Sequence, residues 1–94
     1  MDIRPLSAIL ADLSAIVKTL AHQQSLRFDQ ELLMSERALQ SGIEAQAFRA
    51  IEILVLSAYA SGLTKEPALQ HTLAYSEAVQ VLQMSGKQLP ADLF

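Results

Sequence analysis

The stretch Ser41–Gly62, SGIEAQAFRAIEILVLSAYASG, contains the most hydrophobic window of this chain. Its apolar residues recur at spacings of three and four, so on a helix they cover a face about 180° wide. A face this broad is typical of a central helix in a small bundle, and we predict a helix over residues 43–61. Ser41 and Glu44 have the spacing of a capping box at its start. The face comprises Ile43, Ala47, Phe48, Ala50, Ile51, Leu54, Val55, Ala58 and Tyr59.

Two large apolar residues of this stretch, Ile53 and Leu56, fall outside that face, beside Arg49 and Glu52. The stretch is long enough to cross a membrane, but it carries Glu44 as well as Arg49 and Glu52. Because a charge at the bilayer centre costs about 2.5–3.5 kcal/mol, these three residues exclude a membrane span. We therefore expect Ile53 and Leu56 to contact either the chain's own core or another chain.

The three glycines, Gly42, Gly62 and Gly86, each follow a serine. Because glycine readily adopts the left-handed conformation that ends helices, we interpret them as C-terminal helix stops. Together with the apolar stripes between them, they predict an all-α bundle of three or four helices. The predicted helices span residues 5–23, 25–41, 43–61 and 66–85.

The helix predicted over 5–23 carries the clearest stripe, and Pro5 suits its first turn. The stripe loses phase after Leu20, but neither glycine nor proline separates residues 5–23 from 25–41, so this region forms one helix or two. We favour a break near residues 22–25, where Ser25 is a candidate N-cap. The stripe of 5–23 comprises Leu6, Ile9, Leu10, Leu13, Ile16, Val17 and Leu20, and that of 66–85 comprises Leu69, Leu73, Ala74, Tyr75, Val79 and Leu82.

The domain organisation follows from the length of 94 residues, which suits one hydrophobic core. We predict a single helical domain over residues 1–86 and a short C-terminal tail over 87–94. The tail is apolar at Leu89, Leu93 and Phe94. We expect it to dock on its own bundle rather than to act as a free peptide ligand.

Composition and motifs argue against most chemical functions. The chain carries a formal net charge of −3, and its basic residues are scattered, whereas a nucleic-acid binder needs a clustered basic face. It lacks cysteine, a glycine-rich phosphate loop and a G-x-S-x-G motif. His22 and His71 have no second metal ligand three or four residues away. We predict a protein with no enzymatic activity, no cofactor and no metal. The N-terminus is a poor secretory signal, so the cytoplasm is the default location.

Several large apolar residues lie outside the predicted stripes, which indicates more apolar area than one small domain can bury. Such residues, exposed together, form the kind of patch that binds proteins. We therefore predict a protein–protein interaction module (an adaptor, a secretion or assembly chaperone, or an inhibitory or regulatory subunit), with a homodimer as the simplest closed assembly. The candidate partner-binding residues are Ile53, Leu56, Leu26, Leu33, Met34, Leu93 and Phe94.

Three alternatives stay open on the sequence. A helix-turn-helix at the Gly62 corner would make the chain a DNA-binding regulator. A bundle rich in Leu, Ile and Met could instead hold a small apolar ligand between its helices. In the third, four helices close around all of the apolar residues and leave a monomer, with the helix over 43–61 buried on nearly all sides.

Overall fold

The computed structural model describes residues 4–93, and every regular element in that range is helical. The predicted all-α class is therefore confirmed. The four longer helices are α1 (Leu6–Gln23), α2 (Asp29–Ser41), α3 (Glu44–Ala60) and α5 (Leu73–Met84), and two single turns, the 3₁₀ turn η1 (Leu63–Lys65) and α4 (Pro67–Gln70), lie between α3 and α5.

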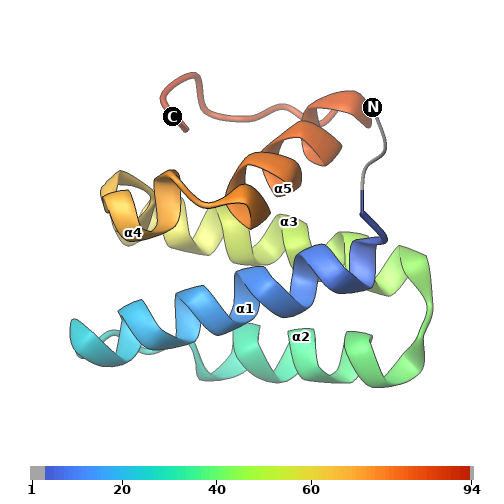
Figure 1. Cartoon of the computed structure of the whole chain (residues 1–94), viewed down its shortest axis with the longest axis horizontal. Coiled ribbons are helices and arrows are strands. Elements are labelled where there is room, and N and C mark those ends of the chain that lie inside the picture. Colours follow the sequence, from blue (N-terminus) through green and yellow to red (C-terminus); the bar gives the residue numbers. More distant parts are fainter. Residues whose placement is uncertain (1–3, 94) are drawn as a thin grey trace.

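The helices form a compact bundle around α1 and α3 (Figure 1). On one side, α2 packs only against α1 and α3. On the other side, α4, α5 and the C-terminal tail cover α1 and α3 (Figure 1). In consequence α2 is an outer helix, whereas α3 is covered by neighbours on most of its circumference.

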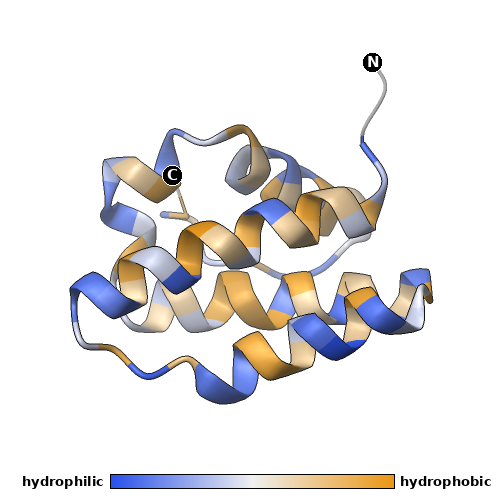
Figure 2. Ribbon diagram, turned by 60° about the horizontal axis from the view of Figure 1, so that its bottom comes forward, coloured by the Kyte–Doolittle hydropathy of each residue, from blue (hydrophilic) through white to orange (hydrophobic). Residues whose placement is uncertain are grey.

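The core confirms the broad apolar face of α3. Hydrophobic residues predominate along α1 and α3, with single hydrophilic residues between them, whereas hydrophilic residues make up more of α2 (Figure 2). Phe48 and Tyr59 pack against the core at the edge of the α3 face, but Ile43 is 51% exposed, contrary to the prediction. The reason is that Ile43 lies in the turn before α3, at the end of the bundle. The buried residues of α3 are Ala47, Ala50, Ile51, Leu54, Val55 and Ala58.

The stripe predicted for the first helix is confirmed almost in full. Leu6 and Ile16 pack partly buried against the core, and the rest of the stripe is buried. Ala21 extends the buried face into the last turn. The buried residues of the stripe are Ile9, Leu10, Leu13, Val17 and Leu20.

The break between the first two helices is confirmed: α1 ends at Gln23, within the predicted region of residues 22–25. The second helix begins at Asp29 instead of residue 25, and Ser25 is not its N-cap. Ser25 has a φ of 55°, a left-handed conformation that reverses the chain after α1. Phe28, which is buried, takes the N-cap position and anchors the start of α2 in the core.

The helix predicted over 66–85 is two helices. The chain leaves helical geometry after α4, where Thr72 has an extended backbone with φ −85° and ψ 150°. The Thr72 hydroxyl accepts a hydrogen bond from the backbone N–H of Tyr75 at 3.2 Å, which makes Thr72 the N-cap of α5. The sequence pattern did not indicate this cap, because the apolar stripe continues across the break between α4 and α5.

The predicted glycine stops are confirmed, whereas the capping box at Ser41 is not. Gly42, Gly62 and Gly86 have φ values of 67°, 85° and 80°, and each lies just after a helix. Ser41 is the last residue of α2, and its hydroxyl accepts from the N–H of Ile43 at 3.2 Å. Glu44 is then the first residue of α3, too early in the helix to complete a capping box.

Candidate partner-binding surface

The seven residues predicted to bind a partner lie in different environments. Leu33 and Leu56 are exposed, at 45% and 36% of their surface. Leu26, Met34 and Ile53 are partly buried, and Leu26 and Met34 pack against the core. Leu93 is buried, and Phe94 lies outside the described residues.

Leu93 corrects the prediction, because the tail packs it into the chain's own core with 3% of its surface exposed. The Tyr75 hydroxyl donates a hydrogen bond to the carbonyl oxygen of Leu93, and the Tyr59 hydroxyl donates to Asp92 Oδ1 at 2.7 Å. At the start of the tail, Lys87 Nζ lies 3.5 Å from Glu52 Oε2. These contacts fit the expectation that the tail docks on its own bundle.

Three further exposed apolar residues were not among those predicted to bind a partner. Ile43, Leu73 and Met84 are 51%, 65% and 69% exposed. Leu73 was expected in the stripe of the last helix, but it lies in the first turn of α5, where the chain has just left α4. The exposed apolar area of residues 4–93 is therefore smaller and more scattered than predicted. Within that range, two of the predicted residues, Leu33 and Met34, line one groove together.

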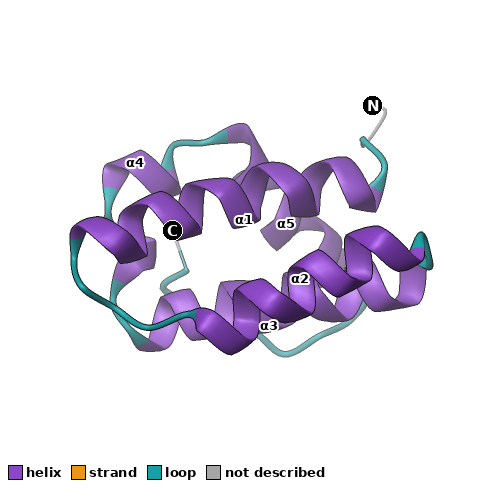
Figure 3. Ribbon diagram, turned by 90° about the horizontal axis from the view of Figure 1, so that it is seen from below, coloured by secondary structure: helices purple, strands orange, loops and turns teal. Residues whose placement is uncertain are grey.

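This groove lies between α2 and α3, which are side by side and antiparallel (Figure 3). The groove has a volume of about 500 Å³. Leu33 and Met34 supply its apolar surface, and Arg37 and Arg49 supply its charge. The full lining is Gln30, Leu33, Met34, Arg37, Ala38, Gln46 and Arg49.

Two further predicted residues lie on the groove side of α3, although neither lines the groove itself. Ile53 lies one helical turn beyond Arg49, on the same side of the helix, and Leu56 follows three residues later. We call the combined region the α2–α3 surface. It comprises Leu33, Met34, Arg37, Arg49, Ile53 and Leu56.

A second groove, of about 510 Å³, runs between α1 and α2 and shares Leu33 with the first. It carries acidic side chains from α2, Asp29 and Glu36, together with Lys18 from α1. Leu33 therefore lies on a ridge with cationic groups on one side and mainly anionic groups on the other. Within residues 4–93, Asp29, Arg37 and Arg49 take part in none of the ion pairs, which leaves their charges open to a partner.

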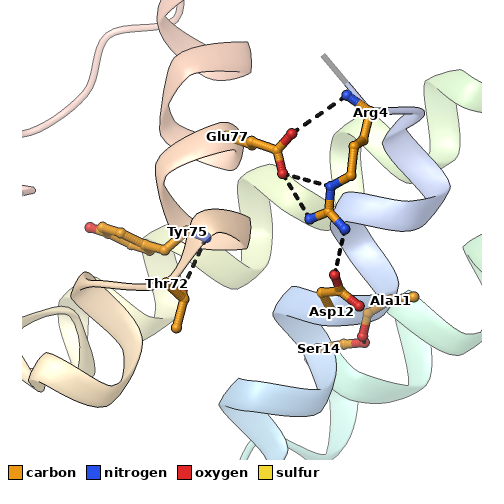
Figure 4. A network of polar contacts seen from close by, with 7 residues as sticks. All are labelled: Arg4, Ala11, Asp12, Ser14, Thr72, Tyr75 and Glu77. Carbon is orange, nitrogen blue, oxygen red and sulfur yellow. Dashed lines mark hydrogen bonds and ion pairs between the residues drawn. The ribbon is translucent and has the colours of Figure 1, made fainter. Parts of the chain in front are cut away.

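The best-developed polar cluster lies elsewhere, between the start of the chain and α5 (Figure 4). Arg4 lies between two carboxylates: its Nη2 is 2.7 Å from Glu77 Oε1 and its Nη1 is 2.6 Å from Asp12 Oδ2. Glu77 is the one buried charged residue in the described part of the chain. Hydrogen bonds from Arg4, to Glu77 first and Asp12 second, raise the pKa of its guanidinium above the usual range. The cluster attaches the N-terminal segment to α5. Arg4 and Glu77 are 73 residues apart in the sequence, so no local pattern predicts their contact.

The hydrogen bond between Tyr59 and Asp92 of the tail shifts the pKa values of both residues. The hydrogen bond from Tyr59 lowers the pKa of the Asp92 carboxyl, and the same bond raises the pKa of the Tyr59 hydroxyl. Burial raises the pKa of Tyr75, which lies inside the core. The contact is therefore made with Asp92 ionised and Tyr59 protonated.

No three potential metal-ligating side chains lie together in residues 4–93, and none of the helices in that range is long and apolar enough to cross a membrane. The corner at Gly62 leads into a single 3₁₀ turn and then into the four-residue α4. We therefore take the α2–α3 surface as the candidate site.

Comparisons of the chain with protein-family models, with curated proteins and with solved structures gave no match.

Proposed function

We propose that this chain is a non-enzymatic protein-binding module that holds a helix of another polypeptide against the α2–α3 surface. One observation carries the proposal: the groove combines apolar side chains with Arg37 and Arg49, which form no ion pair within residues 4–93. Covering the exposed parts of Leu33 and Leu56 would contribute about 1 kcal/mol each. The arginines would set the register of the bound helix through its acidic residues.

A module of this kind suits an adaptor, a secretion or assembly chaperone, or an inhibitory or regulatory subunit. Each of these roles requires a stable fold that presents one helical surface, and none requires a catalytic group. The proposal includes a cytoplasmic location, which fractionation of the host cells tests directly.

The geometry favours protein binding over the DNA-binding alternative. A recognition helix has to be long enough to lie in the major groove and to present several side chains to it. The helix that follows the Gly62 corner, α4, has four residues and ends before Thr72. Its neighbourhood offers Lys65 as the nearest cation, next to Glu66.

Site-specific photo-crosslinking in the host cells tests the proposed function. We expect a crosslinking amino acid in place of Leu33 or Leu56 to give an adduct of discrete mass, because both side chains are exposed on the surface. The control carries the same amino acid in place of Gln80, an exposed residue of α5 on the far side of the bundle. The Leu56 adduct should weaken when Arg37 and Arg49 are both changed to Asp. Equal adducts at all three positions, or none, would show that the surface binds no partner.

A further inference from the structure

The outer face of α2 carries three exposed residues in one row: Asp29, Leu33 and Arg37. They are spaced four residues apart, so they form a single ridge along the helix, with an anion at one end, a leucine in the middle and a cation at the other. Asp29 and Arg37 lie about 12 Å apart along the helix axis, and neither takes part in an ion pair within residues 4–93.

The order of these residues makes the ridge complementary to itself. If a second α2 lies antiparallel against the first with Leu33 on the two-fold axis, Leu33 meets Leu33 of the second copy. Arg37 then comes opposite Asp29 of the second copy, and Asp29 opposite its Arg37. This reciprocity is the property of a two-fold symmetric interface. A parallel arrangement would bring like charges together, so the ridge selects the antiparallel one.

We propose that the chain forms a symmetric dimer in which α2 packs antiparallel against α2 of a second copy, with Leu33 at the centre. This inference rests on the proposed function and deepens it by naming the partner as the chain itself. Leu33 and Arg37 belong to the α2–α3 surface, and Asp29 lies beside it on α2. The charge pattern supports this partner over an unrelated helix, since the ridge supplies every charge that it needs.

The position of α2 in the fold leaves the ridge accessible. This helix packs only against α1 and α3, and it lies at the edge of the bundle (Figures 1 and 3). Its 13 residues span about 20 Å. A single helix of this length offers less contact area than the roughly 800 Å² per subunit of a typical stable interface. The grooves on either side of Leu33 widen the contact through Arg49 of α3 and Lys18 of α1. The dimer is accordingly concentration-dependent and more readily dissociated than an obligate one.

Charge reversal tests the pairing, with sedimentation equilibrium of the full chain as the readout. In Asp29→Arg the ridge carries two cations, and in Arg37→Asp it carries two anions. Each variant alone should raise the dimer dissociation constant by about tenfold or more, because like charges then face each other. An equimolar mixture of the two variants should restore dimers, because every cation then meets an anion. The double variant Asp29→Arg/Arg37→Asp has the same composition as the natural chain and should also dimerise.

Circular dichroism of each variant, recorded in parallel, keeps a loss of folding apart from a loss of pairing. A natural chain that stays monomeric at every concentration would overturn the dimer, and a dimer that both single variants leave unchanged would overturn the α2 contact. The crosslinking experiment separates these failures from that of the proposed function. An adduct at a mass other than twice that of the chain would reject the second copy while leaving protein binding intact.

Discussion

The side chain of Leu93 is held in place by polar contacts at two consecutive residues. Asp92 accepts a hydrogen bond from Tyr59, and the carbonyl oxygen of Leu93 accepts one from Tyr75. Between these contacts the leucine side chain enters the core, which Leu89 also contacts from the tail. A residue with this environment should stabilise the isolated chain without any partner.

The matched pair Leu93→Ala and Leu73→Ala tests this at the level of single side chains. Removing a buried leucine costs about 2–5 kcal/mol in the free energy of unfolding, and the tail position of Leu93 favours the lower end. The same change at Leu73, which is 65% exposed, should fall within about 0.5 kcal/mol. Urea denaturation followed by circular dichroism measures both. Equal effects would mean that the Leu93 side chain contributes no more to the stability of the bundle than an exposed leucine.

At the scale of the helices, the break between α4 and α5 depends on Thr72. Its hydroxyl accepts the N–H of Tyr75 and also donates to the carbonyl oxygen of Leu69 at 2.6 Å, so one side chain satisfies backbone groups of both helices. The corner lets η1 and α4 turn Leu63 and Leu69 into the core before α5 begins.

Replacing the cap tests how much the corner depends on it. We expect Thr72→Ala to lower the free energy of unfolding by about 1 kcal/mol, the usual cost of losing an N-cap. Thr72→Ser keeps the hydroxyl and serves as the control, with most of the stability retained. Thermal melts of the two variants provide the measurement. If they melt together, the hydroxyl is not what stabilises the start of α5.

How far each element could be predicted depended on whether its signal was local. The three glycines and the stripe of the first helix are local patterns, and they gave the helix class and most helix ends. Thr72 and Ser25 act through one hydrogen bond and one dihedral angle, which apolar periodicity does not register. At the candidate surface, Leu33 and Leu56 followed from helical phase alone.

The rest of the candidate site required the three-dimensional packing. Whether Leu26 and Leu93 are exposed depends on the path of a loop and a tail across the bundle, and the exposure of Met34 depends on how α2 packs against α3. No residue spacing encodes either. The same holds for Arg37 and Arg49, which meet in one groove because two antiparallel helices place them there. Sequence reasoning treated both arginines as part of a scattered set of charges.

The stability of the whole molecule should depend on pH through the tail. The folded pKa of Asp92 is lowered, so its contribution is present above the unfolded value of about 3.9 and is lost as pH falls through the folded pKa. The folded pKa of Tyr59 is raised, so its contribution is present below about 10 and is lost as pH rises through the folded pKa. Both contributions are complete only between these limits.

Comparing the natural chain with Tyr59→Phe isolates this contribution. We expect the difference in melting temperature to be largest from about pH 5 to pH 9 and to shrink beyond either end. Tyr75 is present in both proteins, so its own titration cancels in the difference. A difference that stays constant from pH 3 to pH 11 would show that the hydrogen bond between Tyr59 and Asp92 does not couple to folding.

The burial of Leu93 also limits how a tag or reporter can be attached to the C-terminal tail. A purification tag or fluorescent reporter joined after Phe94 would begin next to Leu93, whose side chain is buried in the core. A bulky attachment there would compete with that side chain for space. A linker of several flexible residues would relieve that competition. A reporter without one would record its own interference instead of the behaviour of the native bundle.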